Sequence, residues 1–595
     1  MPLFENKQTQ YTLIGILLAL FLGALDQTIV ATALPEIVQD LNGLSRYAWV
    51  ATSYLVASTA LVPIYGKLAD TYSRKTIELI AIGFFLSGSF LCGLAGEFGA
   101  LPLLGDGMSQ LIIFRAIQGV GGAGLFAMAF IVIADLFPPA ERGKYQGFVG
   151  AVFGIASVLG PWVGGLLTDH GSDLIPGVAG WRWVFYVNLP FGALALWFII
   201  RRMPPLLPQG ERQPLDYWSA LLLIAGLVPL VLALQMDKAT FPWDSWVTIS
   251  LVVAGLVSLS FFSYRSIRSA NPILDFGLFK NSVFRTSNLA LFFLGASFFS
   301  IIIFLPLYVV NVVGVSATRA GIALVPLSLG LVFGSIVSGQ LVSRFGHYRW
   351  WMLGGLTLLF TGVLLLHFMT PNISYWTVVF YTLICGLGVG PSLPLYTLAI
   401  QNAVDMRQIG QATSASQFFR QIGGALGAAL MGTLLATSLA SSFSHDMPPA
   451  LQQTVQAGGA PTSELSSSGG NEIGERIGQA YEQVYQRVAQ AVTADDRAEI
   501  RTLADNPLLA GDTQQQLQQG ITLSQLPSFH QELQQQAQQT SAEAQEAIRQ
   551  AFNTAITRIY FYTLFIVAAG FFVTWFVPEI PLRKSNQAVE SALAS

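Results

Sequence analysis

The side chains in this sequence that could do chemistry lie inside apolar runs. Asp26 stands in FLGALDQTIVATALPEI (21–37), with Gln27 and Thr28 beside it, and Arg115 stands in LIIFRAIQGVGGAG (111–124). A carboxylate near the middle of a membrane-spanning helix costs roughly 2.5–3.5 kcal/mol, so it normally faces a bundle interior or a wet pathway. Because burial favours the protonated carboxyl and a nearby arginine favours the ionised one, Asp26 could bind and release a proton.

Asp26 and Arg115 are expected at similar depths. Asp26 lies eight residues before the end of its apolar run and Arg115 six residues after the start of another, roughly 12 Å and 9 Å at 1.5 Å per residue. If these ends share one side of the membrane, the two side chains can meet. The pair is then either a proton switch or a structural salt bridge that fixes helix packing, and the sequence leaves both open.

A second group of charges lies in GKLADTYSRKT (66–76). Basic residues beside a membrane usually mark orientation only, but Asp70 sits between Lys67 and Arg74, where no orientation rule requires an acid. Asp135, at the end of another apolar run, is a plausible partner for Arg74. These residues form either a charge latch that depends on conformational state or a set of solvated charges.

Glycine-rich stretches in the sequence predict close helix contacts. GVGGAG (119–124) matches the dinucleotide-binding pattern GxGxxG, but it follows an arginine inside an apolar helix with no strand before it, so that function is excluded by context. Small residues let helices approach closely in a bilayer. In GFVGAVFGIASVLGPWVGG (147–165), Pro161 removes a backbone hydrogen bond and could bend the helix that carries it.

Several classes of site are not indicated. The sequence has no GxxxxGK[ST] phosphate loop, its five histidines are scattered without metal-ligand spacing, and no Ser/His/Asp or Cys/His set can be argued. A formal net charge of −3 does not suggest nucleic acid as a partner. We therefore predict no enzyme activity, no cofactor and no metal.

The elements that must position these residues are membrane-spanning helices. Of 595 residues, 53% are hydrophobic and only 11% are charged, and mean hydropathy is +0.56. A soluble surface needs about 25% charged residues, so the chain belongs to the polytopic membrane class. Fourteen apolar windows are long enough to span a bilayer. They are 11–34, 48–66, 76–96, 109–135, 145–168, 183–201, 216–236, 246–264, 286–311, 319–342, 350–369, 375–398, 413–439 and 557–578.

Basic residues predict the orientation of these helices. An even number of spans puts both termini on one side, and lysine and arginine concentrate on the cytoplasmic side. The short loops opposite the N-terminus hold only Arg46, Arg182, Lys238 and Arg319. The N-terminal side holds Lys7, Lys67, Arg74, Lys75, Arg142, Lys144, Arg201, Arg202, Arg212, Arg265, Arg268, Lys280, Arg285, Arg344, Arg349, Arg407, Arg583 and Lys584. We expect a multi-pass protein of the cell membrane with both termini cytoplasmic.

An internal repeat divides the chain. GKLADTYSRKT follows the second window and GQLVSRFGHYR (339–349) follows the tenth, which predicts six helices, two spacer helices and six more. The expected parts are an N-terminal six-helix bundle (1–201), a linker with two extra helices (202–285), helices 9–13 of the C-terminal bundle (286–439), an insertion (440–556), and the last helix with a cytoplasmic tail (557–595).

The insertion at 440–556 is rich in Gln, Ala, Ser and Glu and is expected outside the cytoplasm. Propensity and spacing predict helices in NEIGERIGQAYEQVYQRVAQAV and FHQELQQQAQQTSAEAQEAIRQAF. The stretch VQAGGAPTSELSSSGGN (455–471) is typical of a flexible linker. An extracytoplasmic partner for this segment is possible on these grounds.

Taken in order, the motifs resemble the major facilitator superfamily, specifically its fourteen-helix drug/proton antiporter branch. LDQTIVATALPEI is similar to that branch's first-helix signature, GKLADTYSRKT to its loop motif GxLaDrxGrk, and RAIQGVGGAG to its fourth-helix motif. GIASVLGPWVGG is similar to the antiporter motif, and WRWVFYVNLPFG (181–192) to the segment that opens helix 6. The resemblance covers about residues 10–440 and 557–580.

The resemblance implies roles for individual residues. Asp26 and Arg115 would take part in proton coupling, and Asp70, Arg74 and Asp135 would form a cytoplasmic charge relay. The antiporter helix would be shaped by Gly160, Pro161, Gly164 and Gly165. The sequence departs from the family pattern at Thr71, where a basic residue is usual, and at Ser73 and Ala156, where glycine is usual.

These observations together predict a proton-coupled exporter of hydrophobic or amphipathic small molecules, with protons and the lipid bilayer as its other partners. Gln27, Gln118 and Arg420 are weak candidates for the substrate cavity; Arg420 could meet an anionic substrate or extend its charge to the membrane surface. Two alternatives stay open. One is a dedicated exporter of a single endogenous lipid or metabolite, and the other is a non-transporting membrane scaffold or receptor.

Overall fold

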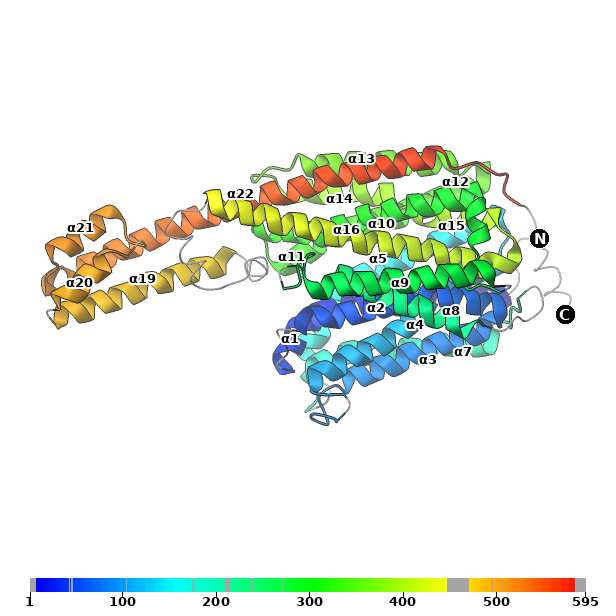
Figure 1. Cartoon of the computed structure of the whole chain (residues 1–595), viewed down its shortest axis with the longest axis horizontal. Helices are drawn as coiled ribbons and strands as arrows, with labels where there is room; N and C mark the ends of the chain where they lie inside the picture. Colours follow the sequence, from blue (N-terminus) through cyan, green and yellow to red (C-terminus); the bar gives the residue numbers. More distant parts are fainter. Residues whose placement is uncertain are drawn as a thin grey trace.

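The protein is a long helical molecule, shown in Figure 1 as a computed structural model. It describes residues 7–583 except 42, 44–45, 103, 174, 176, 209–214, 237, 239, 270, 447–469, 495 and 507. Within these residues the only β contact is an isolated bridge between Leu101 and Gly105. Lys584 and most of the predicted linker VQAGGAPTSELSSSGGN lie outside the described residues.

The first bundle is built from the N-terminal third of the chain, drawn in blue and cyan in Figure 1. Its helices are α1 (Lys7–Asp40), α2 (Tyr47–Thr71), α3 (Arg74–Gly93), α4 (Gly107–Leu136), α5 (Pro139–His170), α6 (Trp183–Tyr186) and α7 (Asn188–Arg202). Two spacer helices follow, α8 (Tyr217–Gln235) and α9 (Trp246–Arg268).

The second bundle and the outer segment take up the remainder. The bundle comprises α10 (Ser282–Asn311), α11 (Ala317–Ile322), α12 (Val325–Phe345), α13 (Arg349–His367), α14 (Tyr375–Val389), α15 (Ser392–Ala403), α16 (Ile409–Asp446) and the last part of α22 (Leu526–Trp575). The outer segment holds α19 (Gly470–Thr493), α20 (Arg497–Ala504) and α21 (Gly511–Gln519). Short 3₁₀ turns are η3 (Gly171–Asp173), η4 (Gly180–Arg182), η5 (Phe276–Lys280), η6 (Met406–Gln408) and η7 (Leu523–Gln525).

Fourteen of the described helical segments are long and apolar enough to cross a membrane, as the sequence windows predict. Several begin at a polar cap, because the first backbone N–H groups of a helix lack partners within it. Asp106 caps α4 through Ser109 N, Asp216 caps α8 through Ser219 N, and Asn281 caps α10 through Val283 N and Phe284 N. These caps set where the spans begin.

The two bundles are joined at one end of the molecule. We call this the motif end; it holds both copies of the repeat, residues 66–76 and 339–349. There α5 packs against α12, and α2 packs against α16. Arg583 also lies at this end, where its carbonyl accepts a hydrogen bond from Ala140 N at the start of α5.

The spacer helices α8 and α9 pack on each other and reach the rest of the protein mainly through α2 and α16. Arg265 of α9 binds Asp216 at the start of α8, with 3.0 Å between Nε and Oδ2. An apolar crevice lined by Leu223, Phe262, Phe418 and Phe419, among others, separates them from the bundles.

The outer segment stands away from the bundles on the last helix. Helix α22 is 50 residues long and crosses position 557, the predicted start of the last span, without a break. At 1.5 Å per residue it is about 75 Å long, more than twice the roughly 30 Å of a bilayer core. Helix α19 packs along its outer half, and Figure 1 shows this pair extending beyond the bundles.

Candidate functional site

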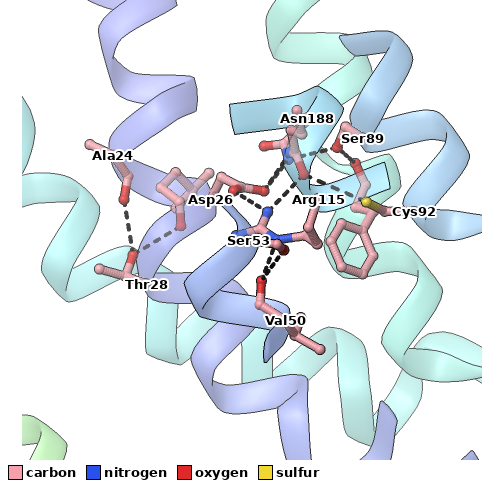
Figure 2. Close-up of polar contacts among 12 residues, drawn as sticks. Ala24, Asp26, Thr28, Val50, Ser53, Ser89, Cys92, Arg115 and Asn188 are labelled. Atoms are coloured by element: carbon pink, nitrogen blue, oxygen red, sulfur yellow. Dashed lines mark hydrogen bonds and ion pairs between the residues drawn. The ribbon is translucent and has the colours of Figure 1, made fainter. Parts of the chain in front are cut away.

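Asp26 lies at the centre of a buried polar cluster in the first bundle (Figure 2). Its side chain is 0% exposed. One carboxylate oxygen, Oδ2, binds Nη1 of Arg115 at 2.6 Å. The other, Oδ1, accepts hydrogen bonds from Nε2 of Gln118 at 2.7 Å and from Nδ2 of Asn188 at 3.2 Å. Both carboxylate oxygens are therefore satisfied, as an ionised carboxylate deep in a protein requires.

Arg115 is held from several sides as well. Its Nη1 also donates to Oε1 of Gln118 at 2.7 Å, and its Nε points to the carbonyl of Val50 at 3.4 Å. The guanidinium carbon lies 4.5 Å from the centre of the Tyr54 ring, which adds a cation–π contact. Arg115 is thus fixed between α2 and α4, facing Asp26 on α1.

Matching depth brings Asp26 and Arg115 together, as the sequence predicts. The helices are longer than the apolar windows, since α1 runs to Asp40 and α4 begins at Gly107, but both grow at the same side of the membrane. Counted from these helix ends the depths are unequal, about 21 Å for Asp26 and about 12 Å for Arg115 at 1.5 Å per residue, so it is the direct contact that shows the two side chains at one level. The charges neutralise each other, which is what makes a deep acid and a deep base tolerable in one bundle.

Asn188 and Ser89 belong to this cluster, and sequence reasoning missed both. Nδ2 of Asn188 donates to Oγ of Ser89 at 3.0 Å as well as to Asp26, and Ser89 donates to the carbonyl of Phe185. Cys92 lies at 3.7 Å from Gln118. A signal was present, because Asn188 interrupts the apolar run WRWVFYVNLPFG just before Pro190. The cluster therefore draws on α1, α3, α4 and α7.

Gly160 and Gly164 let α5 approach α1 closely. A Cβ at Gly160 would collide with the Thr28 hydroxyl, and one at Gly164 would collide with the Thr32 hydroxyl. Thr28 Oγ1 donates to the carbonyl of Ala156 across this contact at 3.0 Å. The contact begins two residues from Asp26, so a movement of α5 bears directly on the helix that carries the acid.

Gly165 and Pro161 occupy different surroundings. A Cβ at Gly165 would meet open space, so the α1–α5 contact does not need a glycine there. Pro161 lies inside α5, one residue after Gly160. Ala156 stands where the family pattern has glycine, and it is fully buried.

The charges Asp70, Arg74 and Asp135 meet at the motif end. Nε of Arg74 lies 2.8 Å from Oδ2 of Asp135, and the Arg74 guanidinium also donates to the carbonyl of Ala69. Nη2 of Arg74 is 3.9 Å from Oδ1 of Asp70. The side chains of Arg74 and Asp70 are only 3% and 4% exposed, which does not match a set of solvated charges.

Asp70 connects the two bundles. Its carboxylate accepts hydrogen bonds from the backbone N–H of Gly410 at 2.7 Å and of Gln411 at 2.8 Å, in the first turn of α16. A helix N-terminus attracts an anion because its free N–H groups and its dipole point that way. Sequence reasoning placed Asp70 with Arg74 but did not identify α16 as its partner. Asp70 therefore caps a helix of the opposite bundle.

The first glycine of each repeat copy also makes an inter-bundle contact. A Cβ at Gly66 would collide with the hydroxyl of Ser414 on α16. A Cβ at Gly339 would collide with the carbonyl of Gly143 on α5. Between them, Nε2 of Gln146 donates to Oε1 of Gln401 at 3.0 Å. The bundles are therefore closed against each other at the motif end.

The three predicted cavity residues do not gather at one place. Gln118 is a member of the Asp26 cluster and is fully buried. Gln27 is exposed, and its side chain interacts with Tyr54, at the edge of that cluster. Arg420 lies on α16 in the second bundle, where its Nη2 donates to Oε1 of Gln417 at 2.8 Å.

Glu78 is a buried acid that sequence reasoning did not single out. It lies one turn after Arg74 on α3 and is 0% exposed. Neither carboxyl oxygen has a hydrogen-bond partner within the described part of the chain. An unpaired carboxylate is costly in such a place, because nothing in the described part of the chain replaces its hydrogen bonds to water.

Nothing in the described residues suggests a metal centre. No cluster of three or more His, Cys, Asp or Glu side chains occurs among them that could hold a metal ion. The chemistry that the Asp26 cluster can do is proton transfer and the making and breaking of an ion pair.

The family of the chain follows from comparison with known proteins. Residues 16–428 match the family model of the Major Facilitator Superfamily. Multidrug resistance protein 3 of Bacillus subtilis (strain 168) is 40% identical over 422 residues, which are 71% of this chain and 78% of that protein. The chain belongs to the major facilitator superfamily.

Further members of the superfamily are similar at comparable levels. The multidrug transporter protein MdtP of Bacillus subtilis (strain 168) is 39% identical over 426 residues, 71% of this chain and 74% of that protein. The rubrofusarin-specific efflux pump aurT of Gibberella zeae is 34% identical over 417 residues, 69% of this chain and 73% of that protein.

Solved structures support the fold. The human organic anion transporter MFSD10 has a TM-score of 0.54 at 15% identity and covers 72% of this chain and 94% of its own. The proton:xylose symporter XylE has a TM-score of 0.51 at 12% identity, covering 72% and 88%. The predicted fold class, an all-helical membrane protein of the major facilitator type, is confirmed.

Like its relatives, this major facilitator protein is a multi-pass membrane transporter and not an enzyme. Small molecules crossing the membrane are its substrates. The matched residues end at 428, so the outer segment and α22 lie beyond the family model. What that segment does has to be argued from this chain alone.

Proposed function

We propose that this transporter exports hydrophobic or amphipathic small molecules in exchange for protons, by alternating access between its two bundles. The observation that carries the proposal is the buried cluster of Asp26, Arg115, Gln118 and Asn188. It offers one acid that can change charge inside the bilayer. The names of its relatives, which include multidrug transporters and efflux pumps, support export of such molecules.

Protonation of Asp26 would change the balance of the whole cluster. The carboxylate now holds three donors, and a protonated carboxyl could hold them only weakly, since charge-assisted hydrogen bonds are about twice as strong as neutral ones. Arg115 would then lose its counter-charge. The cluster joins α1, α3, α4 and α7, so its weakening would loosen the first bundle from inside.

The contact between α1 and α5 offers a route from this change to the bundle interface. Thr28 binds Ala156 two residues away from Asp26, and α5 in turn carries Gly143 against Gly339 of the second bundle. A shift of α1 would therefore act on α5, and α5 on α12. We propose that proton binding at Asp26 favours opening at the motif end in this way.

The structure is closed at the motif end, and we propose that this end faces the cytoplasm. The proposed orientation places both termini in the cytoplasm and residues 440–556 outside the cell membrane, which agrees with the excess of basic residues beside the motif end. Protons would enter from outside and leave inside. One charge moving through 100 mV supplies about 2.3 kcal/mol, before any pH gradient is added.

Export of a single endogenous lipid or metabolite is a second candidate. It is favoured by the outer segment, which lies beyond the residues that match the family, and by the relative that is named as specific for rubrofusarin. A partner outside the cytoplasm for residues 440–556 belongs to this candidate. A scaffold that transports nothing has no support, because the named relatives are transporters.

An everted-vesicle assay tests the proposal. Dye uptake driven by a pH gradient is compared between the parent protein and Asp26→Asn, which keeps the shape of the side chain and removes its titration. We expect uptake driven by the gradient to be lost. Asp169→Asn is the matched control, because Asp169 is exposed near the end of α5. Equal pumping by Asp26→Asn and the parent would overturn proton coupling at this residue.

A second readout separates coupling from folding. Purified parent protein in weak buffer should release protons when dye is added, and Asp26→Asn should bind dye without releasing them. If the parent releases no protons while vesicles still pump dye, transport stands but antiport with protons does not.

A further inference from the structure

Arg420 is a deep cation in the second bundle, and none of the described residues gives it an acidic partner. It lies eleven residues after Ile409, the start of α16, which is roughly 16 Å of helix and about the middle of a bilayer core. Its Nη2 donates a hydrogen bond to the neutral amide of Gln417, and its Nε is buried without a partner in the described residues. The guanidinium is therefore incompletely satisfied where water is scarce.

The surroundings of Arg420 contain no acid to balance it. Between Ser282 and Leu439 the sequence has a single acidic residue, Asp405. Asp405 is exposed and precedes α16, about 22 Å along the chain direction from Arg420 at 1.5 Å per residue. In the first bundle, by contrast, Arg115 faces Asp26 at 2.6 Å and Arg74 faces Asp135 at 2.8 Å.

Extension of the side chain to the membrane surface does not explain Arg420. An arginine side chain reaches only a few ångströms, and its hydrogen bond to Gln417 holds it beside its own helix. Gln417 is itself buried, at 2% exposed. The charge therefore stays at depth, where it is only half-buried and can still be reached by a small molecule.

The helix next to Arg420 carries an aromatic ring against α16. One turn further along α16, Gly424 has no side chain, and the ring of Phe299 from α10 lies against it. An acidic group at Arg420 would thus have an aromatic surface beside it. Such a combination of a fixed cation and an adjacent ring fits an amphipathic acid better than a cation.

We propose that Arg420, oriented by Gln417, is a binding site for the acidic group of amphipathic organic acids, which form a substrate class of this transporter. A planar guanidinium binds a carboxylate through two parallel hydrogen bonds, which restores the partners that Arg420 lacks. This inference rests on the proposed export of amphipathic molecules and specifies the chemistry of their polar group.

A matched pair of dyes tests the proposal. Fluorescein and rhodamine 6G share a ring system but carry opposite charges at neutral pH. Their binding to the purified full-length protein is measured by fluorescence anisotropy. We expect the parent to prefer fluorescein and Arg420→Gln to weaken fluorescein binding roughly 10- to 100-fold, the loss of a charge-assisted hydrogen bond. Rhodamine 6G binding should stay within twofold or improve.

Three further comparisons show whether a change in binding comes from the charge of Arg420. Arg285→Gln removes an exposed arginine from the first turn of α10 and should leave both affinities unchanged. If Arg420→Gln does not fold, fluorescein is compared on the parent protein with its doubly methylated derivative, the methyl ether methyl ester, which is neutral and should bind more weakly. Arg420→Lys keeps the charge but not the planar fork, so we expect an intermediate loss of fluorescein binding.

The outcomes distinguish this inference from the proposed function. Equal weakening of both dyes by Arg420→Gln, or a preference of the parent for rhodamine 6G, would overturn the acid site. If fluorescein binds as expected but vesicles export neither dye, the acid site stands and the proposed export fails.

Discussion

Asp70 of the first bundle accepts a hydrogen bond of 2.7 Å from the backbone N–H of Gly410, at the start of a helix of the second bundle. The two residues are 340 positions apart. This contact makes the closed state at the motif end dependent on one carboxylate. It also gives the repeat motif at 66–76 a physical role, since Asp70 and Gly66 of the same motif both touch α16.

Removing the Asp70 carboxylate should open the motif end. We expect Asp70→Ala to destabilise the closed state by about 1–2 kcal/mol, the typical contribution of a charged helix cap, and Asp70→Asn by less. Spin labels at the exposed Tyr72 and Phe345 would report a longer mean distance. Asp135→Asn breaks the pair with Arg74 within the first bundle and should leave this distance shorter than in Asp70→Ala. Unchanged distances in Asp70→Ala would contradict the role of the cap.

A methyl group at Gly339 should oppose the same closure. Within a helix, alanine is normally more favourable than glycine by up to about 1 kcal/mol. At Gly339 the added Cβ meets the carbonyl of Gly143, and such overpacking costs about 1–3 kcal/mol. The substitution should therefore destabilise the closed state. Gly339→Ala should therefore transport dye more slowly, as measured in vesicles. Gly354→Ala, where a Cβ meets open space on α13, is the control and should transport normally with equal or higher Tm.

Glu78 should be replaceable by an apolar residue. Both of its carboxyl oxygens are buried without partners in the described structure, and such groups cost about 1–3 kcal/mol each. Glu78→Leu should raise the Tm of the purified protein by several degrees, while Glu78→Gln, which remains polar, should not. A lower Tm in Glu78→Leu together with lost dye transport would instead show that the carboxyl is used.

Asp216 should stabilise the spacer helices by an amount that does not change with pH near neutrality. Burial alone would raise its pKa, but hydrogen bonds from Arg265 and Ser219 outweigh burial and lower the pKa to about 2. Because the folded pKa is depressed, the stabilisation is fully present above the unfolded value of about 4 and is lost as the pH falls through about 2. Asp216→Asn should lower Tm by a similar amount at every pH from 5 to 8. A difference that varied within this range would refute the assignment.

The sequence predicts the spans and the Asp26–Arg115 pair well because both depend on local properties. Apolar length determines a span, and one deep acid needs one deep base at the same depth. Asn188 was missed because a neutral amide carries no cost large enough to reveal its partner. The contact of Asp70 with Gly410 was missed because the carboxylate binds backbone N–H groups, which every residue except proline has and which give no signal in the sequence.

Boundaries defined by composition were less informative at the end of the chain. The polar stretch before 557 and the apolar stretch after it differ strongly in residue type, yet both favour helix, so α22 runs through the change. Glu78 and Arg420 show a related limit. Sequence depth flags Arg420 but not Glu78, and whether a partner stands opposite either residue depends on how neighbouring helices are rotated.

The continuous helix α22 makes the outer segment a lever. Its inner half packs with α10 and α13 of the second bundle, and its outer half carries α19 without an intervening joint in the helix. If that bundle rocks as proposed, a small angular change at the membrane becomes a large displacement at the far end of α22. A partner bound at the far end of the α19–α22 pair would therefore need little force to slow or speed each transport cycle, although it binds well outside the bilayer.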